Sequence, residues 1–195
     1  MELLLDTEKR YSYADYLTWM DDKRRELVDG YIRMMSAPKA QHQEIIMNLS
    51  AKLYNIIERN RGGCKIYPVP FDVRLPKNGE REDNKIDTVV QPDICIVCNP
   101  AKIEERGCLG APDFIAEIYS PSTIKYDLGE KFNLYEAVGV REYWVVLPAA
   151  VQVFILQSDG KYDKGTVYED GKIPVHIFDG IEIEYSDIFK DILKL

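Results

Sequence analysis

The chain has 195 residues, of which 46% are hydrophobic and 30% charged, and its formal net charge is −8. This composition argues against disorder and predicts a single domain, residues 1–195, with a substantial core. No apolar run reaches the roughly 18–20 residues of a membrane span, and residues 1–6 lack the pattern of a signal peptide, so a cytoplasmic protein without membrane association is expected. The acidic balance argues against nucleic-acid binding by electrostatics alone. It does not exclude a nuclease, because a bound cation neutralises the carboxylates that hold it.

Hydrophobic periodicity and turn residues divide the chain into helices and strands. Helices are predicted over 11–20, over 40–60 with an end at Gly62-Gly63, over 124–138 with Leu128, Phe132 and Tyr135 on its core side and an end at Gly139, and from about residue 186. A hairpin is predicted over 25–35 with its turn at Asp29-Gly30, and further strands over 64–67, 71–75, 89–98, 113–119, 142–147, 152–156, 165–168 and 181–183. This order predicts an α/β (α+β) fold in which helices flank a mixed sheet.

The four cysteines are Cys64, Cys95, Cys98 and Cys108. Cys95 and Cys98 are three residues apart on a predicted strand, so their side chains face opposite sides and cannot easily share one metal ion. We predict packed free thiols, as is usual for buried cysteine. A metal-binding or redox pair is the alternative.

Two predicted strands carry a carboxylate among apolar neighbours: Asp93 over 89–98 and Glu117 over 113–119. A carboxylate inside a sheet core is costly unless it is paired, hydrogen-bonded or bound to a metal. If the strands are neighbours, both acids meet at one end of the sheet, where oxygen ligands suit Mg²⁺, with Mn²⁺ as a substitute. Such an ion polarises a phosphoryl oxygen and activates water. The alternative is that both acids lie at strand ends and pair with Arg or Lys.

Phosphoryl transfer also needs a cation against the negative charge that builds up on the phosphate. Lys131, at the edge of the apolar face of the helix predicted over 124–138, is the candidate. Its alternative role is an ion pair with Asp127 on a solvated face. His42, in the first turn of the long helix, and Glu26, just before the hairpin turn, are further candidates. Their alternatives are a surface or capping histidine and an exposed hairpin acid.

Several short segments occur in an order typical of one bacterial family. They are residues 26–30, 34–38, 42, 91–93 (Gln-Pro-Asp), 116–123 (Ala-Glu-Ile-Tyr-Ser-Pro-Ser-Thr), 126–131 (Tyr-Asp-Leu-Gly-Glu-Lys) and 135–144, which ends in Gly-Val-Arg-Glu-Tyr-Trp. A bare Pro-Asp followed by Glu is a weak signal, and the Ser-Pro-Ser and Gly-Val-Arg-Glu-Tyr-Trp segments are much more specific. From about residue 11 to 156 the chain resembles the Uma-type restriction endonucleases, a group within the PD-(D/E)xK nuclease superfamily.

The resemblance implies a restriction-endonuclease-like core, here with an extra N-terminal hairpin and extra C-terminal strands. It implies catalytic roles for Asp93, Glu117 and Lys131, metal ligation by Asp93, Glu117 and the carbonyl of Ile118, and additional site residues at Glu26, His42 and Asp127. The superfamily's usual lysine lies two residues after the acid, where this chain has Tyr119. Lys131, on the following helix, takes its place in the resemblance.

We therefore expect a Mg²⁺-dependent endonuclease that hydrolyses phosphodiester bonds in DNA by attack of metal-activated water. A homodimer is expected from the resemblance alone. The alternative is a catalytically inactive protein of the same fold that serves as a DNA-associated binding or regulatory module, which the acidic balance and Tyr119 favour. Metal binding distinguishes the two, because an active site should lose it in Asp93→Ala.

Overall fold

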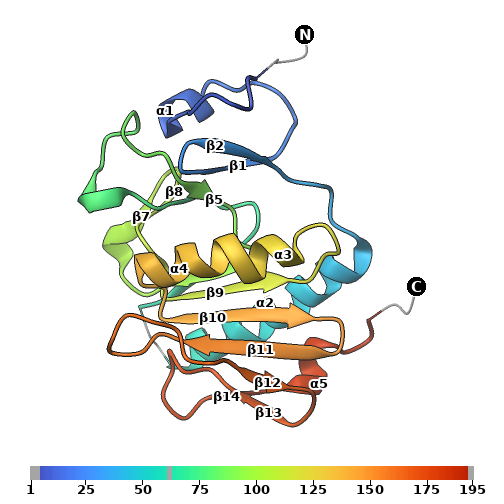
Figure 1. Ribbon diagram of the computed structural model, residues 1–195. Coiled ribbons are helices and arrows are strands. Elements are labelled where there is room, and N and C mark those ends of the chain that lie inside the picture. Colours follow the sequence, from blue (N-terminus) through green and yellow to red (C-terminus); the bar gives the residue numbers. More distant parts are fainter. Residues whose placement is uncertain (1–4, 61–62, 193–195) are drawn as a thin grey trace.

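The computed structural model describes residues 5–60 and 63–192. It has the mixed α+β architecture that the sequence predicts, but two six-stranded sheets and a two-stranded ribbon replace the single sheet expected (Figure 1). Residues 1–4 and Gly62 lie outside the described residues, so the structure does not bear on the expected lack of a signal peptide or on the helix end at Gly62. None of the helices within the described ranges is long and apolar enough to cross a membrane.

The central sheet has the strand order β12-β11-β10-β9-β6-β3. Its strands are β3 (Lys65–Pro68), β6 (Ile94–Val97), β9 (Phe114–Ile118), β10 (Glu142–Leu147), β11 (Ala150–Ile155) and β12 (Thr166–Tyr168). Strands β9 and β10 run parallel, and the other neighbours run antiparallel. The ribbon of β13 (Lys172–Pro174) and β14 (Glu182–Glu184) follows, with the short helix α5 (Tyr185–Ile188) after it.

The second sheet, which we call the hairpin sheet, has the order β2-β1-β5-β4-β8-β7. Its strands are β1 (Arg25–Val28), β2 (Tyr31–Met34), β4 (Val73–Arg74), β5 (Val89–Val90), β7 (Ile103–Glu104) and β8 (Gly107–Leu109). The predicted turn at Asp29-Gly30 is confirmed, with positive φ at both residues, as a tight two-residue hairpin turn requires. The short helices α1 (Tyr13–Tyr16), η1 (Lys77–Gly79) and η2 (Pro100–Lys102) lie in the loops.

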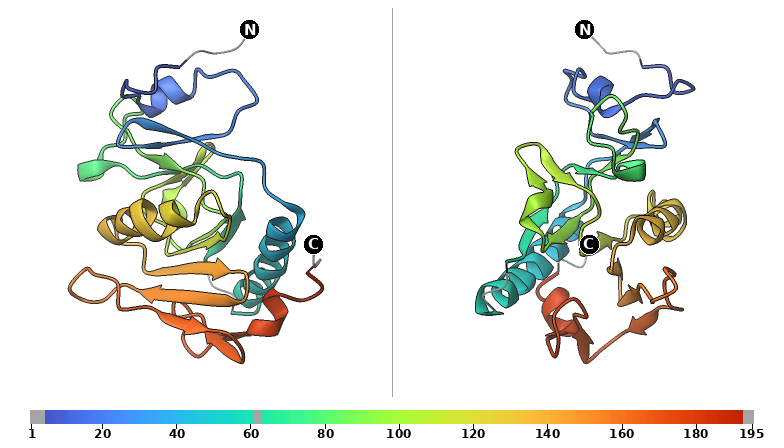
Figure 2. Two further views of the ribbon diagram at one scale, coloured as in Figure 1. Left: turned by 45° about the vertical axis from the view of Figure 1, so that its right-hand side comes forward. Right: turned by 90° about the vertical axis from the view of Figure 1, so that its left-hand side faces the viewer.

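Helices cover both faces of the central sheet (Figure 2). Helix α2 (Ala40–Asn60) packs its apolar stripe, which includes Leu49 and Leu53, against one face. The other face is covered by a helical segment of three parts: α3 (Ile124–Tyr126), the π-helical turn η3 (Asp127–Lys131) and α4 (Phe132–Val138). Alternate residues of each strand therefore enter different cores, as the strand period of two requires.

The strand predicted over 89–98 is wrong in one respect. Residues 91–93 belong to no strand, and they separate β5 of the hairpin sheet from β6 of the central sheet. Pro92 has no N–H for a strand ladder, which explains the break. Asp93 thus lies where the chain crosses from one sheet to the other, not within a strand.

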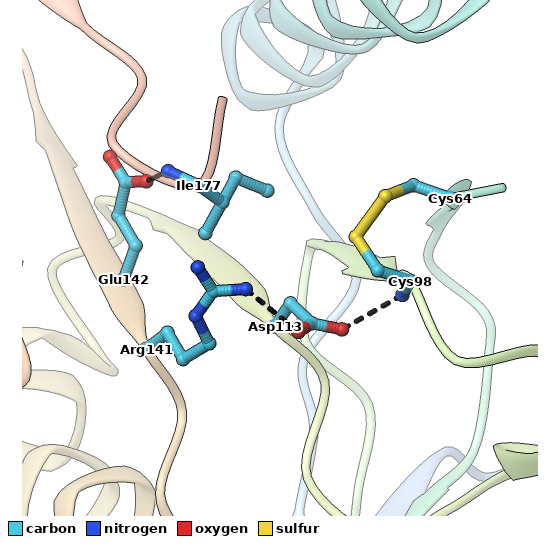
Figure 3. Close-up of a disulfide and its surroundings, with 6 residues drawn as sticks. All are labelled: Cys64, Cys98, Asp113, Arg141, Glu142 and Ile177. Carbon is cyan, nitrogen blue, oxygen red and sulfur yellow. Dashed lines mark hydrogen bonds and ion pairs between the residues drawn. A yellow bond between two sulfur atoms is a disulfide. The ribbon is translucent and has the colours of Figure 1, made fainter. Parts of the chain in front are cut away.

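The prediction of four free thiols is also wrong in part. Cys64 and Cys98 form a disulfide (Figure 3). Cys95 and Cys108 are free and buried. The antiparallel register that pairs Lys65 with Val97 places the two bonded cysteines opposite each other at the ends of β3 and β6. That register follows from the whole fold, so the cysteine spacing could not reveal it. The predicted opposite orientation of Cys95 and Cys98 is confirmed, because they enter different cores.

Loss of this disulfide is expected to lower the free energy of unfolding by about 2–4 kcal/mol, the usual effect of closing a loop of this size. Cys98→Ser should therefore melt below the wild type, and dithiothreitol should lower the melting temperature of the wild type but not of the variant. Thiol titration of the denatured, unreduced wild type should find two of the four cysteines free. Four titratable thiols would contradict the pairing.

Candidate active site

Four carboxylates from distant parts of the chain line one cavity between the two sheets. Glu26 comes from β1, Asp93 from the crossover before β6, Glu117 from β9 and Asp127 from the π-helical turn. All four residues are buried, with at most 9% of their surface exposed. Such a concentration of buried acids needs compensating partners.

Asp93 lies opposite Glu117 at the end of the paired strands β6 and β9. Its Oδ2 accepts a hydrogen bond from the main-chain N–H of Ile118 at 2.8 Å and lies 3.1 Å from Nε2 of His42 in the first turn of α2. Its own N–H donates a longer bond, 3.4 Å, to Oε2 of Glu117. Among the described residues the contacts to the Asp93 carboxylate use Oδ2, so its Oδ1 keeps its lone pairs for another partner.

Glu117 receives two strong donors on one oxygen. Its Oε1 accepts from Nζ of Lys131 and from the hydroxyl of Tyr135, each at 2.8 Å. Tyr135 is fully buried on α4 and was not among the predicted site residues, because a tyrosine on an apolar helix face looks like core packing. These two donors hold the carboxylate so that Oε2 faces Asp93.

Glu26 shares Lys131 with Glu117. The Glu26 Oε1 lies 3.1 Å from the lysine Nζ and also accepts a bond of 2.8 Å from the main-chain N–H of Gln91. Glu26 is therefore not the exposed hairpin acid considered as its alternative. One lysine joins carboxylates from both sheets.

The π-helical turn decides which side of its helix faces the site. Asp127 and Lys131 are both buried, whereas Leu128 is 41% exposed, so the prediction of Leu128 as a core residue is wrong. A π-helical turn holds more residues than an α-helical turn and shifts the positions that follow it relative to those before it, and such turns are frequent at functional sites. The structure pairs Lys131 with Glu117 and Glu26, so the alternative of a solvated pair with Asp127 is wrong.

Burial and like charges perturb the ionisation of this cluster. Burial, together with the nearby Asp93, raises the pKa of Glu117 to about 8, although Lys131 opposes the shift. Burial likewise raises the pKa of Asp127 to about 6. Burial tends to lower the pKa of Lys131, but Glu117, Glu26 and Asp127 outweigh it and raise that pKa well above its ordinary value. Lys131 therefore stays charged, and Glu117 releases its proton less readily than an exposed glutamate does.

The donor set suits a hard divalent cation. Four carboxylates face one lysine and one histidine, and the oxygens Oδ1 of Asp93 and Oε2 of Glu117 retain lone pairs. Carboxylate oxygens with a main-chain carbonyl and water are typical ligands of Mg²⁺. Within residues 5–60 and 63–192, no three His, Cys, Asp or Glu side chains are grouped closely enough to hold a metal by themselves. A site in which only Asp93 and Glu117 supply side-chain ligands, and the main chain and water supply the others, is consistent with this observation.

The cavity above the carboxylates has a volume of about 700 Å³. Cationic side chains line it, namely Arg24, Arg33, Lys39 and Lys131, as do the polar groups of the segment 120–123 that follows β9. The Arg33 guanidinium forms an ion pair of 3.0 Å with Glu130. Each candidate side chain proposed from the sequence, Glu26, His42, Asp93, Glu117, Asp127 and Lys131, lines this cavity, as does Ile118.

Comparison with solved structures identifies the class of fold. The chain superimposes with a TM-score of 0.73 on a protein from Anabaena variabilis described as a "putative nuclease belonging to DUF820", over 93% of this chain and 99% of that one, at 19% identity. A likeness of this kind at low identity establishes the fold: the chain shares with that protein a mixed α+β architecture of sheets and flanking helices, the fold class that the sequence predicts.

The family is established by sequence. Residues 13–185 match the Uma2 family, described as "Putative restriction endonuclease", and the chain belongs to that family. A Synechocystis protein described as "Uncharacterized protein slr1290" is 26% identical over 157 residues, which are 79% of this chain and 77% of that protein.

Proposed function

We propose that the protein is a divalent-metal-dependent endonuclease that hydrolyses phosphodiester bonds in DNA at the carboxylate cavity. Membership of the Uma2 family, described as "Putative restriction endonuclease", supports nuclease chemistry in general. The observation that carries the proposal is the Glu117–Lys131–Glu26 cluster beside Asp93. It combines metal-ligand oxygens with a fixed cation, the two components that hydrolysis of a phosphate ester requires.

In the proposed mechanism, Asp93, Glu117 and the carbonyl of Ile118 would hold Mg²⁺, with Mn²⁺ as a substitute. The ion would supply Lewis-acid activation of water and of the phosphoryl oxygen. Lys131, held by Glu117 and Glu26, faces the charge that develops on the phosphate. Tyr135 fixes the orientation of Glu117, and His42 fixes that of Asp93.

The proposal is tested by a thermal-shift titration with Mn²⁺ and by nicking of supercoiled plasmid under the same conditions. Wild type should be stabilised by RT ln(1 + [L]/Kd), about 2.7 kcal/mol at 100 times Kd, and should nick the plasmid. Asp93→Ala should lose both responses, because it removes a proposed metal ligand. Asp113→Ala is a matched control: Asp113 precedes β9 at its other end, where it bonds Cys98 and Arg141 instead of lining the cavity (Figure 3).

The inactive alternative gives a different result. A protein that keeps only the fold should show neither stabilisation by millimolar Mn²⁺ nor nicking. Metal binding without nicking of any DNA form would reject hydrolysis of DNA while retaining the cation site.

A further inference from the structure

We infer that Arg24 binds a phosphate of the substrate backbone next to the one that is hydrolysed. The inference rests on the proposed function, because it requires a polymer with successive phosphodiesters. It concerns a residue that lies outside the carboxylate cluster and has no part in the chemistry described above.

Arg24 projects into the same cavity as Glu26. It immediately precedes β1, and its carbonyl accepts a hydrogen bond from the N–H of Met35, which continues the pairing of the hairpin. Alternate residues of an extended strand face one side and lie about 6–7 Å apart. Arg24 and Glu26 both line the cavity, so a substrate that reaches the carboxylates also has access to the guanidinium.

The charge of Arg24 is not neutralised by a carboxylate. Arg33 is paired with Glu130, and Lys131 with Glu117 and Glu26. Arg24 instead donates from Nε and Nη2 to the amide Oε1 of Gln91, at 3.3 and 2.9 Å, and within the described chain it forms no ion pair. A full positive charge is thus held in place at the cavity wall.

Gln91 is itself rigidly held. It is buried, and its Nε2 donates to Oδ1 of Asp72 at 2.9 Å and to the hydroxyl of Tyr16 at 3.2 Å. Its main-chain N–H donates to Glu26. One residue therefore fixes both the proposed phosphate-binding arginine and an acid of the site. Gln91 thus orients the Arg24 guanidinium before a ligand binds, and the guanidinium has further N–H groups that can donate to a phosphate in a bidentate arrangement.

The test measures binding of a fluorescein-labelled DNA duplex with Ca²⁺ in place of Mg²⁺. Arg24→Gln should raise the Kd about tenfold and reduce the slope of log K against log salt by about 1, as expected for the loss of one phosphate contact. Arg24→Lys keeps the positive charge but lacks the planar guanidinium that can bind a phosphate through two N–H groups. Its Kd should therefore lie between those of Arg24→Gln and the wild type. Arg59→Gln, which removes the same charge from the exposed last turn of α2, should bind as the wild type does.

An unchanged Kd and salt slope in Arg24→Gln, with a melting temperature equal to that of the wild type, would overturn the inference. Absence of binding by the wild type would overturn it too. Plasmid nicking, measured separately with Mn²⁺, distinguishes this failure from failure of the proposed function. Binding that depends on Arg24 without nicking would reject hydrolysis and keep the phosphate contact, whereas nicking with undiminished affinity in Arg24→Gln would reject only the contact.

Discussion

Lys131→Met is expected to abolish plasmid nicking and to lower the free energy of unfolding by about 3–5 kcal/mol, the usual cost of breaking a buried ion pair from one side. The lysine is 4% exposed and lies within 3.1 Å of carboxylate oxygens of Glu26 and Glu117. Without it, buried acids from both sheets repel each other with no compensating charge. Nicking should fall by at least about 10²-fold, as when a group that stabilises charge in the transition state is removed.

The matched control is Lys125→Met, because Lys125 is an exposed lysine on α3 of the same helical segment. Its loss should change stability by less than about 0.5 kcal/mol. Millimolar Mn²⁺ should restore part of the stability of Lys131→Met, since a cation bound to Asp93 and Glu117 replaces the missing charge. Equal melting temperatures for the two lysine variants would contradict the role given to Lys131.

The metal-free protein should become less stable as the pH rises from about 5 to 8. The pKa of Glu117 is raised to about 8 in the folded chain, from an ordinary value of 4.5. Between these two values the folded state holds a proton that the unfolded state has released, so an increase in pH favours unfolding. The slope for one such proton approaches about 1.4 kcal/mol per pH unit. Asp127, with its pKa raised to about 6, adds to the loss at the lower end of this range.

Glu117→Gln is the control for this pH dependence. It removes the titrating group, so its stability should vary less between pH 6 and 8 than that of the wild type. Saturating Mn²⁺ should also oppose the decline, because ionised Glu117 is the form that binds a cation. Urea unfolding at each pH, with and without the metal, measures all three slopes. A wild-type stability that rises from pH 6 to 8 would show that Glu117 is ionised in the metal-free fold.

Local sequence signals predicted the regular elements well. Asp29-Gly30 specifies its hairpin turn, and the apolar period of residues 40–60 specifies α2 with the bounds that the structure shows. The failures occur where tertiary structure decides. Pro92 marks a break, but only the arrangement of strands shows that the chain changes sheets there. The disulfide depends on the register of β3 with β6, which no local pattern contains.

The candidate site shows the same division. An acid in an apolar run, such as Glu117, is conspicuous in the sequence because its burial needs an explanation. Tyr135 and Arg24 are not conspicuous, because a tyrosine on an apolar helix face and an arginine beside a strand are ordinary. Their positions follow from contacts with Glu117 and Gln91, residues far away in the chain. The π-helical turn over Asp127–Lys131, where Leu128 is exposed instead of buried, has no signature in the local sequence.

The carboxylate cavity is lined by Glu26 of the hairpin sheet, Glu117 of the central sheet and Lys131 of the helical segment. Lys131 follows Glu26 by more than a hundred residues in the chain. A chain still being synthesised cannot assemble this constellation until the ribosome has released residue 131 and the two sheets have met. Nascent chains and fragments that end earlier would lack it altogether. Under the proposed function, a nascent chain would gain nuclease activity only after residue 131 has been made and the two sheets have packed together.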